Sequence, residues 1–92
     1  MSYRKTTITM QKVTIYTTPS CVYCKMVKEF FVKNNVSYEE KNVVTDAEAR
    51  DEMITKSGQM GVPVIQVTKE DGSSSIVIGF DQAKLKEVLG IV

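Results

Sequence analysis

The chain has 92 residues, of which 42% are hydrophobic and 25% charged, so it has room for one hydrophobic core and is expected to fold as a single domain. With 12 basic and 11 acidic residues its net charge is +1, and the absence of a basic cluster excludes the charge pattern of a nucleic-acid-binding protein. No apolar run approaches the ~20 residues of a membrane span and no leader-like segment opens the chain, so we expect the protein in the cytoplasm with no membrane partner. We also expect a monomer.

The N-terminal part of the chain divides at residue 12. Residues 1–11 are polar and irregular, and we predict a flexible N-terminal extension there, followed by one domain over residues 12–92. Residues 13–16 are β-branched or aromatic, which predicts a strand. Residues 17–20 contain a proline that interrupts a ladder of hydrogen bonds, so this segment is predicted to be a turn.

A helix is predicted to begin at Val22, because charged residues alternate there with apolar ones at helical spacing. Asn34 and Asn35 offer a left-handed stop at its end. The apolar stripe of this helix consists of Val22, Met26, Val27, Phe30 and Phe31. The residues that we expect in the core from helical spacing are Met26, Phe30, Phe31 and Met53.

Two further elements follow this helix. Residues 36–44 alternate loosely between apolar and polar side chains and predict a second strand within that range. Thr45 and Glu48 have the spacing of a capping box, and Asp46 adds negative charge to the first helical turn. We therefore predict a second helix over residues 46–57.

The next segment predicts a hairpin. Residues 64–67 and 75–78 are strand-like runs rich in β-branched side chains. Asp71 and Gly72 lie between them and form a common hairpin signal. The two strands are therefore expected to pair antiparallel.

A last helix is predicted to begin after Asp81, a good N-cap residue, and to end at Gly90. Phe80 and Leu85 occupy the two positions of a hydrophobic staple around that cap. The element order is then β-α-β-α-β-β-α, in which the first βαβ unit requires a parallel strand pair with a right-handed crossover. We predict an α/β fold with a four-stranded mixed sheet flanked by helices.

The only cysteines, Cys21 and Cys24, lie three residues apart at the predicted junction of turn and helix, and the chain has no histidine. Positions i and i+3 of a helical turn are about 5–6 Å apart between Cβ atoms, which suits a disulfide. The positive end of the helix dipole favours thiolate over thiol at the first cysteine. We therefore predict a redox-active disulfide in which the Cys21 thiolate attacks a target disulfide and Cys24 resolves the mixed disulfide.

Two structural roles compete with this interpretation of the cysteines, namely a zinc knuckle and an inert place in the core. A tetrahedral zinc site takes four ligands, usually Cys or His, and this chain offers two, so no metal site is expected. A bridge across three residues closes too short a loop to act as a structural staple. Redox turnover without a permanently bound cofactor is therefore favoured.

Three segments make residues 13–89 resemble the glutaredoxin-like family of the thioredoxin fold. Residues 16–24 are similar to that family's strand, loop and Cys-Pro-Tyr-Cys motif, with Val22 where the proline usually stands. Residues 57–63 resemble the segment that leads to the thioredoxin-fold cis-proline, and residues 79–81 resemble the turn into the last helix. The resemblance implies a thioredoxin-like fold, thiol–disulfide oxidoreductase activity and a cis peptide bond before Pro63.

The resemblance also implies where a substrate or glutathione binds. The backbone of Val62 would face the active cysteine and pair with a bound peptide or with glutathione. The residues implied for this site are Thr18, Tyr23, Gln59, Val62, Pro63, Gly79, Phe80 and Asp81. Three of them have simpler alternatives, because Pro63 can merely begin a strand, Tyr23 can shield its helix and Phe80 can serve only the staple.

Departures from the family pattern bear on the electron donor. Thr18 stands where many glutaredoxins have a lysine, and Gln59 where many have an arginine or glutamine. Phe80 stands where many have the second glycine of a Gly-Gly pair. Two of the usual cationic contacts for the carboxylates of glutathione are therefore absent. The pair Gly79-Phe80 instead resembles redoxins that reduce ribonucleotide reductase and are recharged by thioredoxin reductase. We expect protein disulfides or glutathione mixed disulfides as substrates. The expected donor is either glutathione, as a co-substrate, or a thioredoxin-reductase-type flavoprotein, with the flavoprotein favoured. The alternative functions are a glutathione- or iron–sulfur-cluster-binding module, an electron donor to ribonucleotide reductase that is recharged by thioredoxin reductase, and a redox-inactive adaptor.

Overall fold

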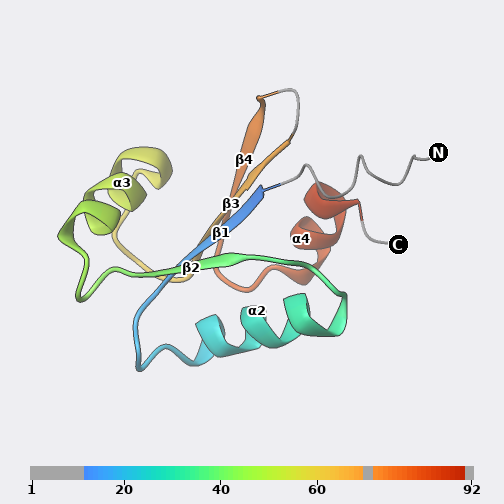
Figure 1. Cartoon of the computed structure of the whole chain (residues 1–92), viewed down its shortest axis with the longest axis horizontal. Coiled ribbons are helices and arrows are strands. Elements are labelled where there is room, and N and C mark those ends of the chain that lie inside the picture. The colour runs from blue at the N-terminus through green and yellow to red at the C-terminus, as the bar shows by residue number, and fades with distance from the viewer. Residues whose placement is uncertain (1–11, 70–71, 91–92) are drawn as a thin grey trace.

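The computed structural model describes residues 12–69 and 72–90, and the predicted extension over residues 1–11 lies outside the described residues, as does Asp71 of the hairpin signal. The elements follow one another in the predicted order (Figure 1). Their bounds are β1 Lys12–Thr17, α2 Val22–Lys33, β2 Glu39–Asn42, α3 Ala47–Ser57, β3 Val64–Thr68, β4 Ser74–Ile78 and α4 Gln82–Leu89. Within the described ranges, no helix combines the length and the apolar character needed to cross a membrane.

The described strands form one sheet in the order β2-β1-β3-β4. β1 and β2 are parallel, as the crossover through α2 requires, whereas β3 is antiparallel to both β1 and β4. The register aligns Tyr16 with Val64, and Val64 with Ile78. The C-terminal ends of β1 and β4 therefore lie beside the N-terminal end of β3, at one end of the sheet. The predicted mixed sheet and hairpin are confirmed.

Helices cover both faces of the sheet, and a cluster of buried side chains lies on each face. α2 and α4 pack on one face and α3 packs on the other, so α3 and α4 lie on opposite sides of the strands in Figure 1. The side chains of β1 alternate between the two clusters, as the pleat of a strand requires. The first cluster contains Val13, Ile15, Val27, Phe30, Phe31, Ile65, Val67, Val77, Leu85 and Val88. The second contains Tyr16, Val43, Ala49, Met53 and Val64.

The buried face of α2 differs from the predicted stripe. The buried residues of this helix are Cys24, Val27, Phe30 and Phe31. Val22 and Met26 leave 65% and 38% of their surfaces exposed. Because successive helical residues are about 100° apart around the axis, these two side chains point away from the side on which Val27 and Phe31 contact the sheet. The prediction that Met26 belongs to the core is therefore wrong, whereas the predictions for Phe30, Phe31 and Met53 are confirmed.

The residues at the start of α3 and at the end of α2 match the predictions only in part. α3 is capped by Asp46, whose side chain accepts a hydrogen bond from the backbone N–H of Ala49 at 3.0 Å. The predicted cap at Thr45 is wrong by one residue, because the Thr45 hydroxyl donates instead to the carbonyl of Asn42 at 3.5 Å. After α2, Asn35 adopts the left-handed conformation with φ 58°, as a stop at this position requires.

Candidate active site

Cys21 and Cys24 meet at the start of α2. They form a disulfide, and their Cα atoms are 5.2 Å apart. Cys21 is the N-cap residue of α2 and is partly exposed, whereas Cys24 lies one turn into the helix and is only 1% exposed. A molecule that approaches this end of the helix can therefore contact the first cysteine but not the second.

The local backbone places donors around Cys21. Its sulfur accepts a hydrogen bond from the backbone N–H of Cys24 at 3.0 Å. The backbone N–H of Cys21 donates to the carbonyl of Thr18 at 3.3 Å, which closes the turn between β1 and α2. The first turn of α2 contains no acidic residue, and Lys25 follows Cys24 directly. Such a helix N-terminus favours negative charge at its cap, so once the disulfide is reduced it favours a thiolate at Cys21.

Two further segments reach the same end of the sheet as the cysteines. The peptide bond between Val62 and Pro63 is cis, as the resemblance implied. Because Tyr16 pairs with Val64, the segment before β3 lies beside the end of β1. The backbone N–H of Gly79 donates to the carbonyl of Pro63 at 2.9 Å, which brings the turn before α4 to the same place. The three segments that carry the predicted site, although far apart in the chain, therefore come together.

On two of these segments, the side chains implied for ligand binding differ in how exposed they are and in whether they already have a hydrogen-bond partner within the fold. Tyr23 leaves 60% of its surface exposed, so its ring is not used to pack α2. The side-chain amide of Gln59 donates to the carbonyl of Gly61 at 2.9 Å, which holds this side chain within its own loop. Thr18 is partly buried and carries no charge. A ligand at this end therefore meets no lysine or arginine at position 18 or 59.

Phe80 and Asp81 both have contacts that stabilise the fold. The Phe80 ring packs edge-on against Phe30, with ring centroids 6.1 Å apart, and lies against the buried cluster that contains Leu85. The Asp81 side chain caps α4 by accepting a hydrogen bond from the backbone N–H of Lys84 at 3.1 Å. The staple and the cap explain both positions without a ligand, so a role of either residue in binding stays a prediction.

Exposed hydrophobic side chains occur on two of the three segments that meet here and at the adjoining end of β4. Besides Tyr23, the first turn of α2 exposes Val22. Met60, in the segment before the cis-proline, is 70% exposed, and Ile78, at the end of β4, is 51% exposed. The spacing of apolar residues had not singled out Met60 or Ile78 as surface residues, because their exposure depends on how the loop and the sheet edge are covered. Val22 and Tyr23 therefore give the surface beside the cysteines an apolar character, whereas Ile78 is aligned with Val64 and Tyr16 and lies on the α3 face of the sheet.

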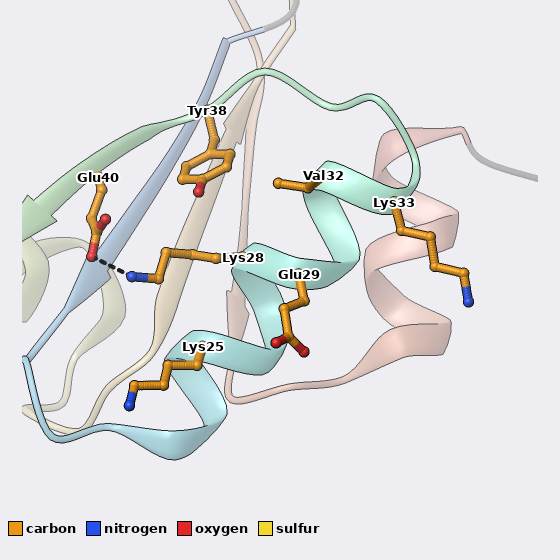
Figure 2. Close-up of a pocket in the computed structure, with 7 residues that line it drawn as sticks. All are labelled: Lys25, Lys28, Glu29, Val32, Lys33, Tyr38 and Glu40. Carbon is orange, nitrogen blue, oxygen red and sulfur yellow. Dashed lines mark hydrogen bonds and ion pairs between the residues drawn. The ribbon is translucent and has the colours of Figure 1, made fainter.

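A polar network that the sequence pattern did not indicate fixes α2 to the sheet. The Thr17 hydroxyl donates to a carboxylate oxygen of Glu40 at 2.7 Å. The Lys28 ammonium donates to the same oxygen at 3.0 Å, a contact drawn in Figure 2. The hydrogen bond from Thr17, followed by that from Lys28, lowers the pKa of Glu40 from its ordinary value of 4.5. Thr17 is the last residue of β1, so the network holds the strand end that leads into the cysteine loop.

A shallow pocket of about 490 Å³ lies on the outer side of α2, toward β2 (Figure 2). Its lining residues are Lys25, Lys28, Glu29, Val32, Lys33, Tyr38 and Glu40. None of the predicted site residues lines this pocket. The candidate site is therefore the surface around the cysteines and not this hollow.

A second polar network joins α3 to the sheet. The Tyr16 hydroxyl donates to a carboxylate oxygen of Glu52 at 3.0 Å, and the Lys41 ammonium donates to the same oxygen at 3.0 Å. Burial, followed by the hydrogen bond to Glu52, raises the pKa of Tyr16 to about 12. Tyr16 is therefore uncharged at neutral pH, and its contact serves to hold α3 in place on the face opposite α2.

Comparison with known proteins gives the family. The Glutaredoxin family model matches residues 13–71. An uncharacterised glutaredoxin-like 8.6 kDa protein in the rubredoxin operon of Clostridium pasteurianum is 38% identical over 77 residues, which cover 84% of this chain and 96% of that protein. Glutaredoxin 3 of Escherichia coli K12 is 39% identical over 56 residues, which cover 61% of this chain and 68% of that protein. The crystal structure of the thioredoxin-like protein BC3987 matches with a TM-score of 0.73 and 38% identity, over 84% of this chain and 99% of that chain. This chain therefore belongs to the glutaredoxin family, as a redox protein of the thioredoxin-like fold with a Cys21–Cys24 pair.

Proposed function

We propose that this protein is a thiol–disulfide oxidoreductase that reduces disulfides of other proteins. The observation that carries the proposal is the unequal placement of the two sulfurs. Cys21 caps α2, is partly exposed and accepts a backbone hydrogen bond at its sulfur, whereas Cys24 is buried one turn deeper. Attack needs an accessible thiolate, and resolution needs only a thiol that reaches the first cysteine, so the two positions suit the two steps.

The reaction then has two steps. The Cys21 thiolate attacks one sulfur of the target disulfide, so that a bond between Cys21 and the target forms, the target's own S–S bond breaks, and the departing thiolate takes up a proton from water. Cys24 loses its proton and attacks the sulfur of Cys21, which closes the Cys21–Cys24 disulfide and releases the second target thiol. Two electrons pass from the cysteine pair to the target, and a donor must later return them.

Trapping the intermediate tests the two roles. Cys24→Ser removes the resolving thiol, so we expect a stable mixed disulfide on Cys21 after incubation with a disulfide-containing protein, detected by mass spectrometry. Cys21→Ser is the matched control and should form no adduct, because the remaining thiol is buried. An adduct on Cys24 in the control, or none in Cys24→Ser, would contradict the assignment.

The donor that we propose is a flavoprotein of the thioredoxin-reductase type. A hydrogen bond from a charged donor to a carboxylate is roughly twice as strong as one from a neutral donor, and positions 18 and 59 offer only Thr18 and Gln59. The amide of Gln59 is also already bonded to Gly61. Glutathione would therefore be held weakly, whereas the exposed Val22, Tyr23 and Met60 offer apolar contacts to a protein. We propose that the reduction of target disulfides takes place in the cytoplasm, where thiols are kept reduced.

The donor is identified by following NADPH oxidation with thioredoxin reductase or with glutathione and its reductase. We expect the faster wild-type turnover with thioredoxin reductase. Thr18→Lys with Gln59→Arg should raise the rate with glutathione, because it supplies two cationic donors, whereas Thr45→Lys with Thr55→Arg adds the same charges at exposed positions elsewhere and should not. Fast wild-type turnover with glutathione that the first pair of substitutions does not improve would contradict the proposed donor.

A further inference from the structure

The two edges of the sheet differ in how they are protected. The sheet order leaves β2 at one edge and β4 at the other. β2 carries Glu39, Glu40 and Lys41, each in an ion pair with a residue outside the strand. β4 consists of Ser74, Ser75, Ile76, Val77 and Ile78, with no charged residue and no proline. Charges and prolines are the usual means by which an edge strand avoids pairing with another chain, so only β4 lacks that protection.

The register shows which backbone groups of β4 face outward. The hydrogen bonds from Lys69 N–H to Ser73 and from Gly79 N–H to Pro63 bracket the β3–β4 ladder. In an antiparallel pair, residues that exchange hydrogen bonds alternate with residues that do not, so Ser75 and Val77 bond to β3. The N–H and C=O groups of the three alternate residues are directed to the open edge. These outward-facing residues are Ser74, Ile76 and Ile78.

The side chains of the same residues add apolar area at this edge. Ile76 and Ile78 are two residues apart and lie on one face of the sheet. Ile76 is partly buried against the cluster beneath α3, whereas Ile78 remains 51% exposed. In the described part of the chain, no strand pairs with the outer side of β4. The edge therefore combines free donors and acceptors with exposed aliphatic surface.

We propose that β4 pairs antiparallel with β4 of a second copy of this chain, about a two-fold axis at Ile76. This register sets Ile76 opposite itself and Ser74 opposite Ile78, so that three residue pairs each exchange two hydrogen bonds and every outward-facing group of the strand finds a partner. An uncharged strand meets its own copy without the repulsion that like charges opposite each other would cause. The sheet then becomes continuous through both copies, and the two Cys21–Cys24 pairs lie toward its opposite ends.

The association is weak and depends on concentration. Two strands of five residues bury far less than the ~1,200–2,000 Å² of a stable specific interface. The monomer predicted from the sequence is then the form present in dilute solution, and the dimer forms only as the concentration rises. Sedimentation equilibrium over a series of concentrations should show the apparent mass rising from one chain toward two.

A charge exchange tests the register. Ser74 and Ile78 are both exposed, so Ser74→Lys with Ile78→Lys should keep the fold and set lysine against lysine across the axis, which should hold the apparent mass at one chain. Ser74→Glu with Ile78→Lys sets opposite charges together and should restore the rise in mass. As a control, Val32→Lys with Val44→Lys adds the same charge at two exposed valines away from β4, and this protein should associate as the wild type does.

Three results would overturn the proposal. The first is a wild-type mass of one chain at every concentration. The second is a Ser74→Lys, Ile78→Lys protein that associates like the wild type, which would place the contact elsewhere. The third is a failure of Ser74→Glu with Ile78→Lys to associate although circular dichroism shows the native fold, which would exclude a two-fold axis at Ile76.

Discussion

The two halves of α2 carry apolar residues at similar spacing but use them differently. In the C-terminal half, Phe30 and Phe31 are 5% and 0% exposed, and their ring centroids are 6.2 Å apart. In the first turn, Val22 and Tyr23 are 65% and 60% exposed, beside the partly exposed Cys21. One half anchors the helix on the sheet, and the other presents the reactive sulfur.

The difference teaches that helical spacing predicts burial only for the side of the helix that faces the rest of the fold. In the first turn of α2, Cys24 faces inward and is 1% exposed, whereas Val22 and Tyr23 lie on other sides of the axis. Apolar residues that a regular pattern would bury are left exposed there, and such exposed apolar surface is typical of a site that contacts a partner. The place where the pattern fails is thus the place where the chemistry is expected.

The largest effect is expected from the anchoring half. Phe31→Ala should lower the free energy of unfolding by about 3–5 kcal/mol, because it empties a fully buried site whose ring also contacts Tyr38 at a centroid distance of 5.2 Å. Urea denaturation measures the loss. Val22→Ala is the matched truncation in the exposed half and should change stability by less than about 0.5 kcal/mol. Equal losses in the two variants would break the comparison.

A smaller effect is expected where the polar network joins the two halves to the sheet. Thr17→Val removes the hydroxyl that donates to Glu40 and keeps the shape of the side chain, so it should cost about 1 kcal/mol in urea denaturation. Thr14→Val changes another buried threonine of β1 that has no hydrogen bond to this carboxylate and serves as the control. A Thr17→Val protein as stable as the wild type would show that the network does not hold this strand end.

The same network gives a dependence on pH. The folded protein lowers the pKa of Glu40 below its ordinary value of 4.5, so this carboxylate contributes stability that is fully present above that value and is lost as the pH falls through the lowered pKa. Urea midpoints over an acidic pH series should therefore fall less steeply for Glu40→Gln than for the wild type. Identical slopes would show that Glu40 is not linked to folding in this way.

The smallest effect on stability is expected between the cysteines, where the chemistry should respond instead. Val22→Pro fixes φ at the first helical residue, a position that tolerates proline, so stability should stay within about 0.5 kcal/mol. The reduction potential, measured by equilibration with a thiol redox buffer, should shift measurably. Val22→Ala leaves φ free and should keep the wild-type potential. A Val22→Pro potential within error of the wild type would mean that this position does not tune the cysteine pair.

Much of the fold follows from local patterns. The strands, the hairpin and the cap at Asp81 depend on neighbouring residues, and the structure has all of them. Met26 was misplaced because the predicted stripe was too wide: at about 100° per residue, its side chain points away from the side on which Val27 and Phe31 contact the sheet. Thr45 was preferred as a cap over Asp46, since both side chains suit that position and only the backbone decides between them.

The candidate site was predictable in part. The spacing of Cys21 and Cys24 was sufficient to predict a disulfide at a helix N-terminus, and the family resemblance supplied the cis bond before Pro63. The contact of Thr17 with Glu40 depends on the register of two parallel strands, and the bond from Gln59 depends on the path of its loop. Neither leaves a periodic trace in the sequence, so only the structure could show them.

The central claim is that Cys21 is the attacking thiol because it caps α2. Thiolate absorbance against pH, measured on reduced Cys24→Ser and Cys21→Ser proteins, compares the two sulfurs one at a time. We predict that Cys21, in the first variant, forms its thiolate at lower pH than Cys24 does in the second, because its sulfur accepts a backbone N–H at the helix N-terminus and Cys24 is buried. If Cys24 ionises at the lower pH, the roles assigned to the two cysteines are wrong.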